Sequence, residues 1–101
     1  MIINGKEYNL LLTTRAYIGI SKLFPHAKSG NIAEYIGDPE SATAAEKIIN
    51  LAVILNNGYC EKTLRDNPNA EVNRLTAEDL LDSGFENFMD IMNAIYDALG
   101  F

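Results

Sequence analysis

The chain has 101 residues and a net charge of -6, and 48% of its residues are hydrophobic and 22% charged. This length suits one domain rather than two, and the apolar content is enough to offset chain entropy, which argues against disorder. The excess of 14 acidic over 8 basic residues argues against nucleic acid or an anionic membrane surface as the partner, because both require a basic face. A basic protein partner, or a charge that only confers solubility, remains compatible with it.

The first predicted element is a β-hairpin over about residues 1–13. The Asn-Gly pair at positions 4 and 5 tolerates the positive φ angles of a type I′ turn. In that register Ile2 faces Glu7 and Ile3 faces Lys6. Strand alternation then predicts one face that packs on the rest of the domain. That face consists of Met1, Ile3, Tyr8, Leu10 and Leu12.

The second arm of this hairpin is longer than the first, so residues 9–13 have no partner if they are extended. Elsewhere in the chain, the strand candidate around Val72 is weak. Because an open strand edge tends to pair with a second copy or a partner segment, we expect an intermolecular edge along residues 6–13. The alternative is a helix that begins earlier and leaves no edge. The expected contact residues are Lys6, Glu7, Asn9 and Leu11.

Two short helices are predicted next, over about residues 14–24 and 31–37. Thr13 and Thr14 offer N-caps for the first, and Pro25 is a plausible stop. A glycine and a proline end the second. The apolar side of the first helix consists of Ala16, Tyr17, Ile20, Leu23 and Phe24.

The longest predicted helix covers about residues 41–57. Its alanine-rich start favours helix, although a buried strand is the competing interpretation for the apolar stretch 48–55. Asn50, the one polar residue of that stretch, either bonds to a neighbouring element or lies on an exposed strip. The Asn-Asn-Gly sequence at 56–58 resembles a helix C-terminus, and residues 59–66 add at most a helical turn or two.

The last two helices are predicted over about residues 76–82 and 85–99. Thr76 and Asp79 have the spacing of a capping pair. The final helix has a broad apolar face, on which two methionines are core residues or, alternatively, an adaptable binding surface. The residues of that face are Phe85, Phe88, Met89, Ile91, Met92, Ile95, Tyr96 and Leu99. Together the elements predict a single α+β domain over residues 1–101, mostly α-helical, with the N-terminal hairpin packed on a cluster of about four to five short helices.

Residues that could support catalysis or metal binding are few. His26 is the only histidine, which excludes a multi-histidine metal site, and no motif joins it to Cys60. The acidic segment 66–71 lacks the glycine of a calcium loop, and Glu78 and Asp79 are explained by the helix dipole. We therefore expect no catalytic, cofactor or metal site, and a protein that is not an enzyme.

The cysteine count and the absence of long apolar segments predict the cellular compartment of the protein. Because Cys60 is the only cysteine, an internal disulfide is excluded and a reducing compartment fits. Lys6 and Glu7 interrupt any signal-peptide pattern. The longest apolar run, residues 51–55, is too short to cross a bilayer. We expect a cytoplasmic protein that does not enter a membrane.

Three short motifs occur in a characteristic order: "NGKEY" at residues 4–8, "RAYIGISKLF" at 15–24 and "LTAEDL" at 75–80. This order resembles phage and prophage tail assembly chaperones, which often open with an NGK-x-Y/F hairpin and a helix of the R-A-x-x-x-[IL]-x-x-x-F kind. They often have LT-x-E-x-[LI] before their last helix. The segment 60–74 is longer than expected for that family. The matching residues of the first two motifs are Asn4, Gly5, Lys6, Tyr8, Arg15, Ala16, Ile20 and Phe24.

The resemblance implies a non-enzymatic assembly factor of the host bacterial cytoplasm. Such a factor binds the tape measure protein and helps the tail tube protein to assemble around it. The hairpin edge also allows a homo-oligomer. Two alternatives are a small acidic regulatory or inhibitory module of mobile-element origin and a structural tail component. The scattered acidic residues weaken the first alternative, and the low strand content weakens the second.

Overall fold

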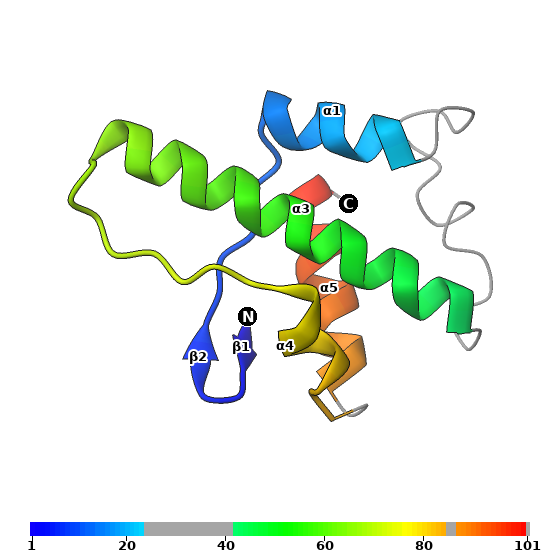
Figure 1. Ribbon diagram of the computed structural model, residues 1–101. Coiled ribbons are helices and arrows are strands. Elements are labelled where there is room, and N and C mark those ends of the chain that lie inside the picture. Colours follow the sequence, from blue (N-terminus) through cyan, green and yellow to red (C-terminus); the bar gives the residue numbers. More distant parts are fainter. Residues whose placement is uncertain (24–41, 85–86, 101) are drawn as a thin grey trace.

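The computed structural model describes residues 1–23, 42–84 and 87–100 (Figure 1). In these residues an N-terminal two-stranded antiparallel hairpin precedes four helices, so the fold is α+β and mostly helical, as the sequence predicts. The helix expected over residues 31–37 lies outside the described residues. The elements are β1 (Ile2–Ile3), β2 (Lys6–Glu7), α1 (Thr14–Leu23), α3 (Ala42–Asp66), α4 (Ala77–Leu81) and α5 (Phe88–Leu99).

The hairpin has the predicted turn and register. Asn4 and Gly5 have φ angles of 53° and 79°, as a type I′ turn requires. Ile2 pairs with Glu7 and Ile3 with Lys6. Of the predicted inner face, Ile3 and Tyr8 are buried and Met1 and Leu10 are partly buried. Leu12 is 37% exposed, because residues 8–13 leave the sheet and strand alternation no longer sets the side-chain directions.

Helix α1 begins at the predicted cap. The Thr13 hydroxyl accepts a hydrogen bond from the Ala16 N–H at 3.1 Å. Ala16 and Ile20 are buried, whereas Tyr17 and Leu23, which were expected inside, are 48% and 37% exposed. The reason is that α1 contacts α3 through its small residues: a Cβ on Gly19 would lie 3.3 Å from Ile54 Cγ2. Phe24 lies outside the described residues.

Helix α3 is the centre of the fold (Figure 1) and is longer than the sequence predicts. It does not end near Asn57 but continues through Gly58 to Asp66. Gly58 is therefore not a C-cap; it provides space where another segment crosses the helix, since a Cβ there would lie 2.9 Å from the Leu11 carbonyl oxygen. Asn50 is exposed. The residues of α3 that the core encloses are Ala44, Ile48, Leu51, Ala52, Leu55, Asn56 and Cys60.

The two C-terminal helices complete the core against α3. The predicted cap of α4 is confirmed: Thr76 Oγ1 accepts from the Asp79 N–H, and the Thr76 N–H donates to Asp79 Oδ2 at 2.9 Å. Helix α5 buries Ile91 and Ile95 and ends at Gly100, whose φ is 87°. Met89, expected on the inner face, is 62% exposed. The first residues of the predicted helix 85–99 fall at positions 85–86, which are not described.

Candidate protein-binding surface

Along the outward edge that begins at β2, two backbone carbonyl groups are bonded by side chains of the same chain. Because the Tyr8 N–H donates to the Met1 carbonyl, its neighbours Glu7 and Asn9 direct their backbone groups away from β1. The carbonyl oxygen of Glu7 accepts from Asn73 Nδ2 at 2.8 Å, and that of Asn9 accepts from an α3 amide at 3.0 Å.

The extended residues 8–13, which we call the strap, cross α3 instead of pairing as a strand. The Leu11 N–H donates to the carbonyl oxygen of Leu55, in the middle of α3, at 3.1 Å. The expectation of an open edge along residues 6–13 is therefore wrong for the carbonyl groups of Glu7 and Asn9 and for the N–H of Leu11. Their partners come from α3 and from the segment before α4, which sequence alone did not place beside the strap.

The four side chains expected to contact a partner are at the surface. Lys6, Glu7 and Asn9 are exposed, and Leu11 is 36% exposed. Asn9 and Leu11 line a hollow of about 410 Å³ between the strap and α5, whereas Lys6 and Glu7 do not. The structure thus brings two of the four together, and a contact role for all four stays a prediction.

Asn56 holds the strap, α3 and the segment before α4 together. Its Nδ2 donates to the carbonyl oxygens of Asn9 and Asn73 at 3.0 and 3.2 Å, and its Oδ1 accepts from the Leu75 N–H at 2.8 Å. The side chain is 1% exposed. Sequence reasoning assigned it to a helix end and missed this role. The available signal was its four-residue spacing from Ala52 and Cys60, both on the buried stripe of α3.

Cys60 belongs to the same buried cluster. Its single S–H has two acceptors within reach, the carbonyl oxygen of Asn73 at 3.5 Å and Asn56 Oδ1 at 3.7 Å from Sγ. Burial raises the pKa of the Cys60 thiol, and the positive charge of Arg74 partly opposes this. A buried, neutral thiol that donates to oxygen atoms packs the core and is a poor nucleophile.

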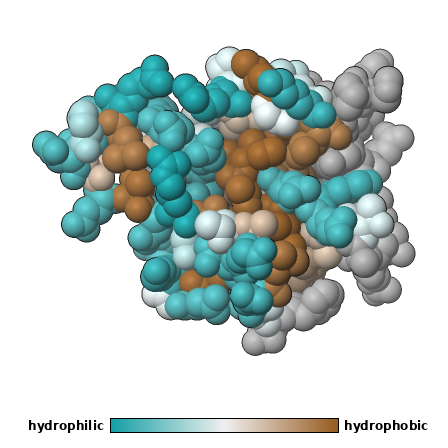
Figure 2. Space-filling view, in the orientation of Figure 1, coloured by the Kyte–Doolittle hydropathy of each residue, from teal (hydrophilic) through white to brown (hydrophobic). Residues whose placement is uncertain are grey.

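A groove of about 530 Å³ lies between α1 and α3. Its apolar lining includes Ile18 of α1, which is 51% exposed, and the half-buried Val53 and Ile54 of α3. Figure 2 shows hydrophobic atoms gathered over the middle of α3 and reaching α1. Among the described residues no carboxylate lines this groove, whereas three cations do: Arg15, Lys22 and Arg74.

Arg74 is fixed at the edge of the groove by two contacts. Its Nη2 lies 2.8 Å from Glu61 Oε1, and its Nη1 donates to Asn57 Oδ1 at 3.0 Å. The hydrogen bond and charge of Arg74 lower the pKa of Glu61, and the reciprocal hydrogen bond raises the pKa of Arg74. The guanidinium is therefore held in one direction while remaining exposed to solvent.

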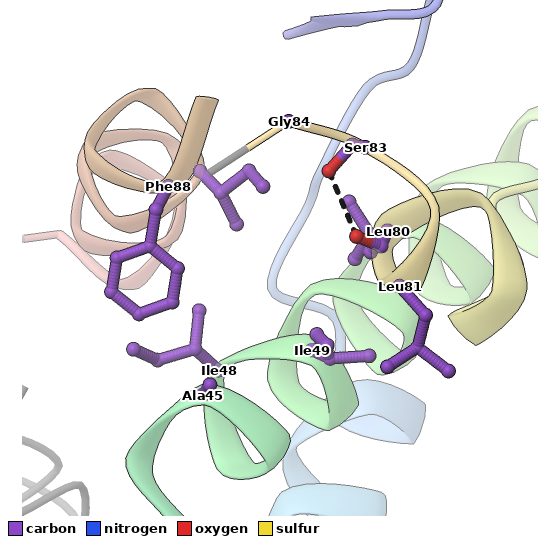
Figure 3. Close-up of a pocket in the computed structure, with 9 residues that line it drawn as sticks. Ala45, Ile48, Ile49, Leu80, Leu81, Ser83, Gly84 and Phe88 are labelled. Carbon is purple, nitrogen blue, oxygen red and sulfur yellow. Dashed lines mark hydrogen bonds between the residues drawn. The ribbon is translucent and has the colours of Figure 1, made fainter. Parts of the chain in front are cut away.

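A smaller apolar hollow of about 190 Å³ lies between α3, α4 and α5. In Figure 3 Ile48 and Ile49 of α3, Leu80 and Leu81 of α4 and Phe88 of α5 surround it. The Ser83 hydroxyl donates to the Leu80 carbonyl at 2.8 Å, which satisfies the polar side chain at its rim. Ile49 of this hollow and Val53 of the groove lie one turn apart on α3, so the two depressions border neighbouring turns of the same helix.

The described residues contain neither a metal-binding cluster nor a membrane-spanning helix. Within residues 1–23, 42–84 and 87–100, no three His, Cys, Asp or Glu side chains are close enough to hold a metal ion. None of the helices described is both long and apolar enough to cross a membrane. His26 lies outside the described residues. No protein-family model, curated protein or solved structure matches the chain.

Proposed function

We propose that this protein is a non-enzymatic tail assembly chaperone of a phage or prophage, which binds the tape measure protein in the host bacterial cytoplasm and promotes assembly of the tail tube. The resemblance of its opening hairpin, first helix and "LTAEDL" motif to that family suggests this function. The observation that carries the proposal is the exposed apolar groove between α1 and α3.

The dimensions of the groove suit a helical partner. Helix α1 has ten residues and is therefore about 15 Å long, which corresponds to about three turns of a helix lying beside it. An amphipathic helix binds such a groove through apolar residues on one face. A tape measure protein exposes long helices until the tube encloses them, and several weakly bound copies along one such partner would gain from multivalency.

The test is a pull-down with this protein as bait, co-expressed with the tail proteins of the same genetic element. We expect the tape measure protein to be captured. Ile18→Asp should abolish capture because it places a charge in the groove, whereas Ile2→Asp, at an isoleucine that is 68% exposed on the hairpin, should not. Circular dichroism of both variants checks that the fold persists.

A third variant, Leu11→Lys, distinguishes the strap from the groove. Loss of capture with Leu11→Lys but not with Ile18→Asp would move the contact to the strap and the hollow beside α5. If the wild-type protein captured no tail component, the chaperone proposal would be rejected.

A further inference from the structure

We infer that the α1–α3 groove selects an amphipathic partner helix that carries carboxylates along both edges of its apolar face. This inference deepens the proposed function and rests on it for the identity of the partner. The groove itself, the charges around it and the helix geometry supply the recognition chemistry.

The charge of the groove is opposite to that of the protein. The chain has a net charge of -6 and 8 basic residues, yet three of these basic residues line this one groove and no described carboxylate does. Glu61 neutralises part of the charge of Arg74 at 2.8 Å and, more weakly, part of the charge of Arg15. Arg15 and Lys22 lie on the α1 side of the groove. A cationic lining on an acidic protein favours an acidic ligand through complementarity and steering.

The spacing of the cations defines the pattern that a partner must present. Arg15 and Lys22 are seven positions apart on α1, which places them about 10 Å, or two turns, apart along the helix axis. A partner helix running beside α1 would meet them with carboxylates two turns apart. Arg74 comes from the segment before α4, on the other side of the groove. Glu61 and Asn57 take two of the five N–H donors of its guanidinium, so the opposite edge of the partner would also carry a carboxylate for the remaining donors.

The apolar residues lie between these charges. Ile18 is three positions after Arg15 and four before Lys22, so it occupies the turn between them. With Val53 and Ile54 it offers the partner an apolar strip, and Ile18 is 51% exposed in the free protein. The partner would therefore place apolar residues at i, i+3 or i+4, and i+7, with carboxylates at both margins.

A second copy of this chain fits the groove less well. On α5 the exposed Asp90 and Asp97 are also seven positions apart, but the apolar residues of that helix, Ile91 and Ile95, are buried in its own core. In the described part of α5 the large exposed apolar residue is Met89. We therefore assign the groove to a different protein.

The test uses two designed, fluorescently labelled helical peptides with the same leucine strip. One carries glutamate at both margins and the other carries lysine. Fluorescence anisotropy at low salt should show the glutamate peptide binding about tenfold more tightly, as expected for two or three exposed charge pairs. The net charge of -6 would by itself favour the lysine peptide. The difference should shrink in 0.5 M NaCl.

Charge reversals locate the effect. Arg15→Glu and, independently, Lys22→Glu should each weaken the glutamate peptide about fivefold. Arg65→Glu makes the same change in net charge at an exposed residue of α3 that does not line the groove, and should leave binding nearly unchanged. Ile18→Asp should remove binding of both peptides.

Three results would overturn the inference: equal binding of the two peptides, preference for the lysine peptide, or an Arg65→Glu effect as large as that of Arg15→Glu. Light scattering that showed a dimer broken by Arg15→Glu would assign the groove to a second copy instead. The outcome is separate from the pull-down. Selective peptide binding without capture of tail proteins would keep the inference and reject the chaperone function. If the Arg15→Glu, Lys22→Glu and Ile18→Asp variants captured tail proteins as well as the wild type does, the chaperone function would stand and the inference would be rejected.

Discussion

Replacement of Asn56 by alanine should be among the most damaging single changes in this protein. The substitution removes the donor for the carbonyl oxygens of Asn9 and Asn73 and the acceptor for the Leu75 N–H. These partners lie in two segments, the strap and the segment before α4, which Asn56 joins to α3. We therefore expect a loss of global stability together with release of the strap from α3.

The magnitude follows from the burial of the groups left behind. Leu75 is 4% exposed, so its N–H would be left unpaired away from water, at about 1–3 kcal/mol. Asn9 and Asn73 are exposed residues, and water can replace part of their bonds, at about 0.5–1 kcal/mol each. The total, about 2–5 kcal/mol, is a large fraction of the roughly 5–15 kcal/mol that keeps a domain of this size folded.

Urea denaturation monitored by circular dichroism measures this difference directly. The neighbouring residue gives the matched control, because Asn57 is exposed and its Oδ1 accepts a hydrogen bond from the exposed Arg74. Asn57→Ala should cost about 0.5 kcal/mol. Equal midpoints for Asn56→Ala and Asn57→Ala would refute the reasoning. In a second variant, Asn56→Asp, the carboxylate would face two carbonyl oxygens, which would raise its folded-state pKa, so stability should fall as pH rises through that pKa.

Gly58→Ala should destabilise the protein by about 1–2 kcal/mol despite the helix propensity of alanine, because its Cβ would lie 2.9 Å from the backbone of the strap. Gly19→Ala, which meets a side-chain methyl at 3.3 Å, should be neutral or stabilising, and urea midpoints compare the two. The Cys60 thiol should react with Ellman's reagent far more slowly in the native protein than in urea, because it is buried and its pKa is raised; equal rates would contradict this. Thr76→Ala should cost about 1 kcal/mol through loss of the cap. The bonds from Thr76 lower the folded-state pKa of Asp79, so the stability they supply is present above the ordinary aspartate pKa and lost as pH falls through the folded value. An acid titration of Asp79→Asn should lack that loss.

The sequence predicts the elements whose signals are local. The Asn-Gly turn fixes the register of the hairpin, and the capping pair Thr76 and Asp79 fixes the start of α4, because each depends on residues within a few positions. The predicted end of α3 is wrong because it depends on a segment that is distant in sequence. Gly58 lets the backbone of the strap, about 45 positions earlier in the chain, approach α3 closely. The local sequence pattern does not contain this contact, so it predicts that the helix ends at the glycine.

The candidate surface is only partly visible in the sequence. The unpaired second arm of the hairpin correctly draws attention to Asn9 and Leu11, but its backbone partners Asn56 and Asn73 are distant in sequence. The groove escapes prediction because it needs residues of α1, α3 and the segment before α4 together. Ile18 could have indicated an exposed apolar surface, because it is strongly apolar and lies outside the predicted inner stripe of its helix.

The hydrogen bonds that close the hairpin edge also set an order in which the chain can fold. The bond from Asn73 to Glu7 joins residues 66 positions apart, and that from Asn56 to Asn9 joins residues 47 positions apart. Contacts of such separation form late, because a long loop must close first. During synthesis the hairpin residues leave the ribosome before Asn56 and Asn73 do, so the carbonyl groups of Glu7 and Asn9 bond to water until those two side chains become available.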